Sequence, residues 1–149
     1  GLVRGTKGPE LRPQALFQDR FLGVVRSGHQ LPRGRITPAR FAAHSQIAVA
    51  RPGWDKRPIE EALARFGLER TVTVTVDSFS TAVGLARASD LIACVPEKHT
   101  GNLRAGMFSF SLPVPLLPFT VSLLWHPRME ADPAHRWLRT CLREVCVQR

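Results

Sequence analysis

Apolar and polar positions in the middle of the chain follow two alternating patterns, one typical of strands and one typical of helices. Residues 45–50 (SQIAVA), 70–76 (RTVTVTV) and 91–95 (LIACV) are short runs rich in Val, Ile and Ala, a pattern typical of strands. The intervening segments, 57–67 and 78–89, repeat apolar residues every three or four positions, as amphipathic helices do. This succession predicts an α/β fold with a largely parallel sheet, in which 70–76 is a buried strand with one apolar face.

Capping residues mark where the helices begin and end. Thr37 and Pro38 predict a short helix over 37–44, and Pro58 and Gly67 bound the helix over 57–67. Ile59, Leu63 and Phe66 share one face of that second helix. A longer helix begins at 132–133 (Asp-Pro), and its apolar stripe comprises Ala134, Trp137, Leu138, Cys141, Leu142 and Val145. An uncovered stripe of this kind favours association between chains.

The two ends of the chain differ from its middle. Residues 14–29 form an extended apolar stretch of one or two strands, 97–106 indicates a short helix, and 107–114 and 119–126 indicate strands. Three prolines make 113–119 a connector. Residues 1–19 are too short and polar for a domain of their own. We therefore expect one lobe formed by 1–19 and 119–149, and a second lobe formed by 20–118.

Composition narrows the class of protein. The net charge of +9 raises the possibility of nucleic-acid binding, but the arginines are scattered and aromatic residues do not interleave with them, which favours a solvated basic surface. No segment predicts an export signal or a membrane-spanning helix. The chain begins at Gly1 instead of Met, which favours a piece of a longer protein. Three cysteines without a CxxC pair indicate buried thiols in a reducing compartment, so we expect a cytoplasmic protein.

Several kinds of chemistry find no support in the pattern. The five histidines lack HxH or HxxxH spacing, so no metal site is expected. No glycine-rich phosphate loop is present, and we expect no cofactor. A nucleophilic role for Cys94 would need a base and an orienting group, whereas Cys94 lies within an apolar strand. An enzyme would need a paired acid and base at the strand ends, and only Asp77 is present there.

The order of these segments resembles the effector-binding domain of LysR-type transcriptional regulators. The resemblance runs through LFQDRFLGVVRSGHQL, IEEALARFGLERTVTVTVDSF, DLIACVPEK and, most specifically, LLPFTVSLLWHPRMEADPAHRWLR. It implies a two-lobed fold like that of type II periplasmic binding proteins, here truncated so that one lobe is incomplete. It also implies a small-molecule effector in the cleft between the lobes, and crossover segments that act as a hinge. The hinge residues are Asp19, Arg20, Phe21, Pro118 and Phe119.

The resemblance also implies the partners of the intact regulator. Its members bind DNA through an N-terminal winged helix-turn-helix, which this chain lacks, and they are usually homo-oligomers. Effector binding closes the lobes and reorients the DNA-binding domains, without catalysis. A solute-binding protein of a transport system shares the fold and is the alternative. The three unpaired cysteines and the match through LLWHPR favour the regulator.

Ligands of open α/β sheets lie outside the carboxyl ends of the strands. Three such ends supply the predicted effector-binding residues, namely Ala50, Arg51, Val76, Asp77, Ser78, Phe79, Val95 and Pro96. Asp77 or Ser78 caps the helix that follows, and capping alone is the competing interpretation. Because the Asp77 carboxylate already occupies the positive field of the helix N-terminus, a carboxylate ligand would be repelled unless Arg51 compensates. We therefore expect a neutral or phenolic effector, with Phe79 providing apolar contact.

Overall fold

The computed structural model describes residues 2–3, 12–50 and 57–125, together with 133–134, 136–138 and 140–141 near the C-terminus. The chain divides into two compact units. The first unit combines Gly1–Asp19 with Pro118–Arg149, and the second unit is Arg20–Leu117. Each is considered by itself below.

The first unit contains a three-stranded antiparallel sheet in the order β1-β8-β2. Its strands are β1 (Leu2–Val3), β2 (Arg12–Asp19) and β8 (Phe119–Trp125). The long pairing runs from Arg12 opposite Trp125 to Asp19 opposite Phe119. The described residues between 133 and 141 are helical, as predicted. Within the predicted apolar stripe, Trp137 is 69% and Leu138 47% exposed, whereas Leu142 and Val145 lie outside the described residues.

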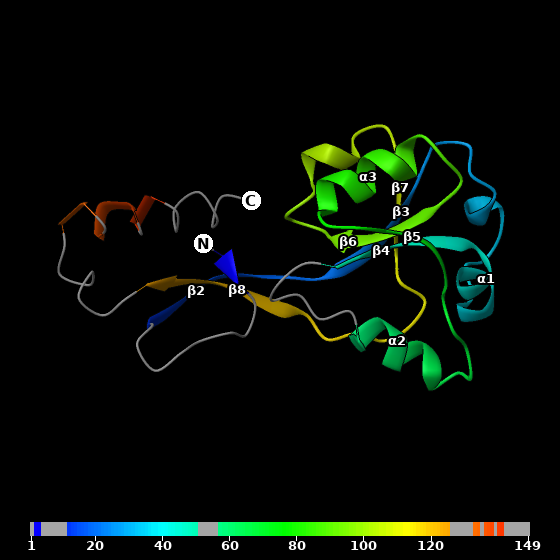
Figure 1. Ribbon diagram of the computed structural model, residues 1–149, viewed down its shortest axis with the longest axis horizontal. Coiled ribbons are helices and arrows are strands. Elements are labelled where there is room, and N and C mark those ends of the chain that lie inside the picture. Colours follow the sequence, from blue (N-terminus) through cyan, green and yellow to red (C-terminus); the bar gives the residue numbers. More distant parts are fainter. Residues whose placement is uncertain are drawn as a thin grey trace. The chain divides into compact units, whose positions relative to one another are not determined.

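The second unit is built on a five-stranded sheet in the order β5-β4-β6-β3-β7 (Figure 1). The strands are β3 (Phe21–Val25), β4 (Ser45–Val49), β5 (Thr71–Val76), β6 (Ile92–Pro96) and β7 (Phe108–Ser111). The helices are α1 (Pro38–Ala43), α2 (Arg57–Ala64) and α3 (Phe79–Arg87), with 3-10 turns η1 (Leu31–Arg33) and η2 (Asn102–Arg104).

The sheet is mixed, so the prediction of a largely parallel sheet is wrong. β4 pairs in parallel with β5 and β6, the strands connected through α2 and α3. β3 pairs antiparallel with both β6 and β7. Strand direction depends on which distant segments become neighbours, and an apolar run in the sequence does not contain that information. The α/β class itself is confirmed.

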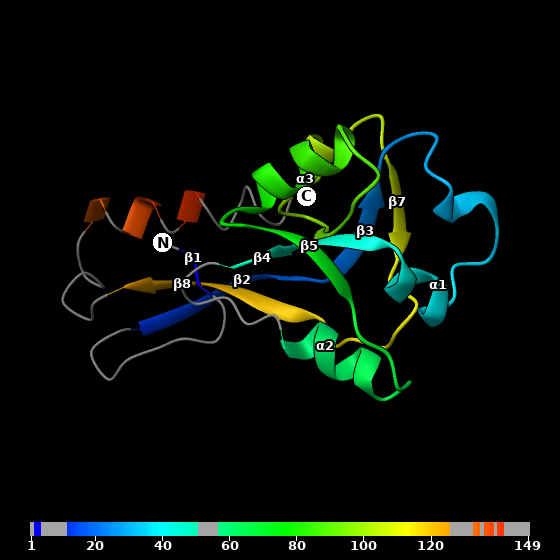
Figure 2. The ribbon, with the colours of Figure 1, turned by 45° about the vertical axis from the view of Figure 1, so that its right-hand side comes forward.

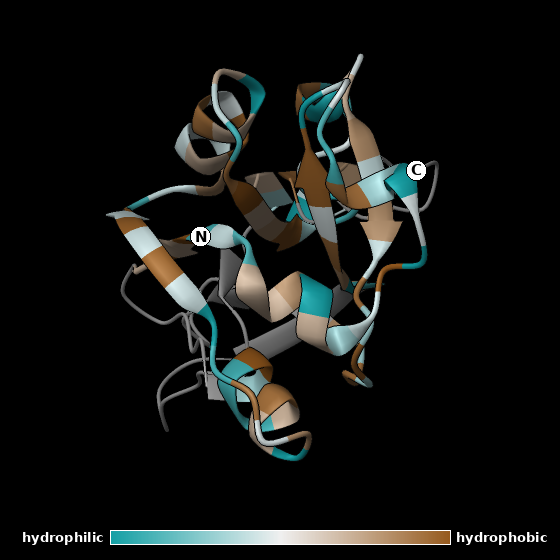
Figure 3. Cartoon of the chain, turned by 90° about the vertical axis from the view of Figure 1, so that its right-hand side faces the viewer, coloured by the Kyte–Doolittle hydropathy of each residue, from teal (hydrophilic) through white to brown (hydrophobic). Residues whose placement is uncertain are grey.

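Helices cover both faces of this sheet (Figures 1 and 2). On one face, α1 and α2 bury Phe41, Ile59 and Leu63 against β6 and β7. On the other face, α3 buries Phe79 and Val83 against β3, β4 and β6. Hydrophobic residues accordingly occupy much of the strands inside this unit (Figure 3). These two apolar layers pack against the sheet from both sides and thereby position the ends of its strands.

Some local predictions hold and others do not. Thr37 caps α1, its hydroxyl oxygen accepting a hydrogen bond from the Arg40 amide at 3.2 Å. Phe66 is 51% exposed and does not share the buried face of α2, because the helix ends at Ala64 and the chain turns at Gly67 with φ +71°.

Two segments are placed differently from the prediction. β5 is an edge strand, with Val72 43% exposed, and is not a buried strand. Residues 97–106 form a turn that contains only the three-residue η2 and not a longer helix. In both places the sequence pattern was compatible with several environments, and the neighbouring elements decided between them.

Candidate functional site

The ends of β4 and β5 lie side by side in the second unit. Val49 is opposite Val76, and the Ala50 amide donates a hydrogen bond to the Val76 carbonyl oxygen at 2.8 Å. β6 runs in the same direction on the other side of β4, so Val95 and Pro96 lie at the same end of the sheet. The carboxyl ends of these three strands form the edge discussed below. The structure thus brings together the predicted residues from all three strand ends, except Arg51, which lies outside the described residues.

The first turn of α3 carries a group of hydroxyls. Ser78 is the N-cap, and its Oγ accepts a hydrogen bond from the Thr81 amide at 3.2 Å. The same hydroxyl donates to Thr81 Oγ1 at 2.8 Å and lies 3.3 Å from Ser80 Oγ. Of the two residues proposed as the cap, Ser78 therefore fills that role, and Asp77 is exposed beside it.

Ser80 and Thr81 did not stand out in the sequence. The available signal was the SFST string, which puts hydroxyls at the N-cap and at the second and third helical positions. The Ser78 hydroxyl donates its proton to Thr81 and accepts from the Thr81 amide, so it can accept a hydrogen bond from a ligand only in place of the one from Ser80. Ser80 and Thr81 are exposed. This arrangement can bind a hydroxyl or another polar group.

The apolar residues predicted for the site are mostly covered. Phe79 is 4% exposed, with its ring edge-on to Phe21 at 6.4 Å and to His99 at 5.9 Å between centroids. Val95 is fully buried and Pro96 is buried. These side chains belong to the core, and of the predicted residues that the structure describes here, Ala50 and Asp77 are exposed.

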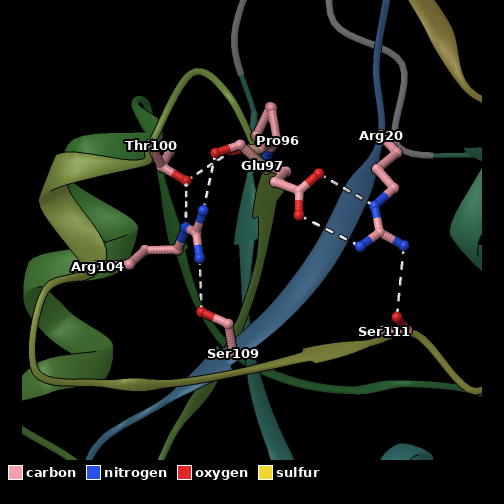
Figure 4. A network of polar contacts seen from close by, with 7 residues as sticks. All are labelled: Arg20, Pro96, Glu97, Thr100, Arg104, Ser109 and Ser111. Carbon is pink, nitrogen blue, oxygen red and sulfur yellow. Dashed lines mark hydrogen bonds and ion pairs between the residues drawn. The ribbon is translucent and has the colours of Figure 1, made fainter. Parts of the chain in front are cut away.

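Arg104 braces the turn that follows β6 (Figure 4). Its guanidinium donates to Thr100 Oγ1 at 3.0 Å, to Ser109 Oγ at 2.6 Å and to the Glu97 carbonyl oxygen at 2.9 Å. Thr100, which is fully buried, donates in turn to the Pro96 carbonyl oxygen at 2.6 Å. The turn 97–100 is thereby fixed to the end of β6.

Arg20 occupies the start of the second unit and pairs with Glu97. Two guanidinium nitrogens lie 3.2 Å from the two carboxylate oxygens, and a third donates to Ser111 Oγ at 3.4 Å. The hydrogen bond from Arg20 lowers the pKa of Glu97 below its ordinary 4.5, against a smaller opposing effect of burial, and the positive charges of Arg104 and Lys98 add to the lowering.

The other residues predicted for the hinge lie on both sides of the boundary between the units. Asp19 and Phe119 are buried and opposite each other at the ends of β2 and β8 in the first unit, where Pro118 is exposed. Phe21 begins β3 in the second unit. Their role as a hinge stays a prediction.

The buried thiol is unsuited to nucleophilic chemistry. Burial raises the pKa of Cys94 to about 11, so the thiol stays protonated near neutral pH. Its Sγ lies 4.0 Å from Gln46 Oε1 inside the sheet. Cys141, also a free thiol, is half-buried, and Cys146 lies outside the described residues.

The described part of the chain shows neither a metal-binding cluster nor a membrane-spanning helix. No group of three or more His, Cys, Asp and Glu side chains there could hold a metal ion. No helix there is both long enough and apolar enough to cross a membrane.

The fold is of the periplasmic-binding-protein-like type seen in effector-binding domains of transcriptional regulators. Residues 2–147 match the family model of the LysR substrate binding domain. The chain belongs to this family, whose members are transcriptional regulators and not enzymes.

A relative found among curated proteins agrees with this assignment. The HTH-type transcriptional regulator SyrM of Rhizobium meliloti (strain 1021) is 35% identical over 128 residues, which cover 83% of this chain. The match covers 39% of SyrM, so the chain spans well under half the length of this relative.

Solved structures show the same fold. A putative transcriptional regulator from Vibrio parahaemolyticus matches with a TM-score of 0.82 and 26% identity, over 99% of this chain and 70% of that one. The effector binding domain of QuiR in complex with shikimate matches with a TM-score of 0.75 and 15% identity, over 99% of this chain and 71% of that one. At 15% identity the second comparison supports the fold alone.

Proposed function

We propose that this chain is the effector-sensing part of a DNA-binding transcriptional regulator, and that its effector binds at the carboxyl ends of β4, β5 and β6. In this proposal residues 20–118 are one lobe, and residues 1–19 with 119–149 are part of the other. One observation carries the proposed effector site. Asp77 and the Ser78 hydroxyl are accessible beside Ala50. These residues lie at the carboxyl ends of the strands, where α/β sheets hold ligands.

The effector we propose is neutral or phenolic. A phenol or alcohol can donate to the Asp77 carboxylate, or to Ser78 Oγ in place of the hydrogen bond from Ser80. A carboxylate ligand would meet the negative charge of Asp77. Carboxylates are nevertheless the informative competing class, since QuiR was solved with shikimate, a hydroxylated carboxylic acid.

Calorimetric titration with matched ligands tests this proposal. We expect 4-hydroxybenzaldehyde to bind this chain more tightly than 4-hydroxybenzoate. Ser78→Ala removes an acceptor for the ligand and should weaken binding of the aldehyde about two- to tenfold, the size of one hydrogen bond. Tighter binding of the carboxylate, or no binding of the neutral compound, would reject the proposed class of effector.

Thr37→Ala is the matched control for the loss of a helix cap. Thr37 caps α1 as Ser78 caps α3, with the same 3.2 Å bond to the third helical amide. Both substitutions should therefore destabilise the chain by about 1 kcal/mol. Only Ser78→Ala should change the affinity for the ligand. Equal affinities in the two variants would mean that Ser78 is a cap and nothing more.

The remaining roles concern the longer protein. We propose that the parent regulator contacts DNA through a helix-turn-helix domain, assembles as a homo-oligomer and acts in the cytoplasm. The family and SyrM, described as an HTH-type transcriptional regulator, support these roles. A transport receptor with the same fold is not favoured, because these matches are to regulators.

A further inference from the structure

The segment that follows β6 is joined twice to the residue at which the chain enters the second unit. The carboxylate of Glu97 binds the Arg20 guanidinium through two atoms, each at 3.2 Å. The Glu97 amide also donates to the Arg20 carbonyl oxygen at 2.9 Å, next to the pair formed by Phe21 and Pro96 in the sheet. A planar two-point contact of this kind restricts orientation as well as distance.

The Arg20 guanidinium also contacts β7, the last strand before the chain leaves the second unit. Arg20 Nη1 donates to Ser111 Oγ at 3.4 Å, and Ser111 is the last residue of β7. The chain leaves the second unit six residues later, after Leu117. Arg20 therefore lies at the entry to the unit and contacts the end of β6 and the start of the exit segment (Figure 4).

Glu97 is also fixed to the proposed effector edge. Arg104 holds the Glu97 carbonyl oxygen, and through Thr100 it connects to the Pro96 carbonyl oxygen. His99, in the same turn, places its ring against Phe79 at the beginning of α3. Pro96 and the N-terminus of α3 are therefore both connected to Glu97 through this turn.

From these contacts we infer that Glu97 is a positioning residue, which through Arg20 couples the end of β6 to the two segments where the chain enters and leaves the second unit. The biological role of this coupling rests on the proposed function, because effector binding at the strand ends would then change the local stability of both segments. The pair is half-exposed, at 52% for the Arg20 side chain and 39% for Glu97. Such a pair contributes little to global stability but can bias a local equilibrium.

Amide hydrogen exchange of the effector-free chain, measured by mass spectrometry, tests the coupling without knowledge of the effector. Glu97→Gln removes the charge and leaves the main-chain hydrogen bonds in place. We expect exchange to rise about fivefold, within a range of roughly two- to thirtyfold, in both 19–22 and 110–117. Ser111→Ala should raise exchange only in 110–117.

Asp90→Asn is the matched control. Asp90 forms an ion pair with Arg26 at 2.6 Å that involves the other ends of the same two strands, β3 and β6. This change should alter exchange near residues 26–31 and 88–92, and by less than about twofold in the entry and exit segments. A role for Glu97 confined to its own turn predicts that neither variant changes exchange in those segments by more than about twofold.

Salt provides a second measurement that needs no substitution. Raising the ionic strength from about 0.1 M to about 1 M shortens the Debye length from about 10 Å to about 3 Å. Exchange in 19–22 and 110–117 should rise with salt in the wild-type chain and not in Glu97→Gln. The inference is overturned if salt has the same effect on both chains, or if the effect of Glu97→Gln stays within 96–101. The proposed function would survive either result, because no effector is present.

Discussion

The two ends of the five-stranded sheet are built from similar parts. At the end where β4, β5 and β6 finish, the Arg20–Glu97 ion pair joins the start of β3 to the turn after β6. At the opposite end, the Arg26–Asp90 pair joins the end of β3 to the turn before β6. Each pair connects the same two strands, so the ion pairs alone do not distinguish a ligand-binding end from a structural one.

The ends differ in how their other polar groups are used. At the Arg26–Asp90 end, His29 is 4% exposed and both its ring nitrogens are engaged, Nδ1 with the Leu31 amide at 3.0 Å and Nε2 with the Asp90 carbonyl oxygen at 2.7 Å. At the Arg20–Glu97 end, Asp77 and the hydroxyls of Ser80 and Thr81 are exposed. The buried polar ring of His29 is satisfied within the fold, whereas Asp77 and the first turn of α3 present polar groups to solvent.

We expect the largest effect on stability from a substitution at the Arg26–Asp90 end of the sheet, where the buried His29 forms two hydrogen bonds. His29→Ala leaves the Leu31 amide and the Asp90 carbonyl oxygen without their side-chain partner. The free energy of unfolding should fall by about 3 kcal/mol, with a decrease of the melting temperature on the order of 10 °C. Thermal unfolding followed by circular dichroism measures this.

His99→Ala is the control for this substitution, because His99 is an exposed histidine at the other end of the sheet. It should cost less than about 1 kcal/mol. If the two variants melt at the same temperature, the contrast between a structural and an open end is wrong.

Acidification should produce a smaller effect, also at the structural end. Burial lowers the pKa of His44, and the charges of His29 and Arg40 lower it further from the ordinary 6.5. The folded state therefore prefers neutral His44, so its contribution to stability is complete above pH 6.5 and is lost as the pH falls below that value. We therefore expect stability to fall on acidification below pH 6.5, by less than the loss expected for His29→Ala.

The measurement is the melting temperature as a function of pH, compared with His44→Asn. The substitution should flatten the profile just below pH 6.5. The Glu97 end should respond only at lower pH, because the pKa of this carboxyl lies below 4.5 and its stabilising ionised form is lost as the pH falls through that range. An unchanged profile in His44→Asn would exclude His44 as the group that titrates.

The parts of the fold that sequence could predict depend on local chemistry. The α1 helix follows from Thr37 and Pro38, whose cap and fixed φ act within one turn. The interpretation of Asp77 and Ser78 as a helix start is local in the same way, although the sequence could not decide which residue is the cap. The prediction that Phe66 shares the buried face of α2 was wrong because the helical spacing of apolar residues in the sequence continues beyond Ala64, where the helix ends.

The parts that sequence missed depend on contacts between distant residues. The antiparallel pairing of β3 with β6 joins residues about seventy positions apart, and no alternation of apolar residues specifies it. The position of β5 at the sheet edge follows from the order of the other strands. The polar network after β6 collects Arg20, Glu97, Arg104 and Ser111 from three separate segments, so no motif in the sequence could have revealed it.

The smallest expected effect compares the two ion pairs directly. Glu97→Gln and Asp90→Asn should each lower the free energy of unfolding by less than about 1 kcal/mol, because both pairs are substantially exposed and compete with water. Urea denaturation at low and high salt measures the change, and salt should reduce the small difference between each variant and the wild type. A loss above about 2 kcal/mol for Glu97→Gln alone would mean that the Arg20–Glu97 end is as structural as the His29 end. Equal and small losses would instead leave both pairs free to act on local motions without endangering the fold, which is the condition that a coupling role for Glu97 requires.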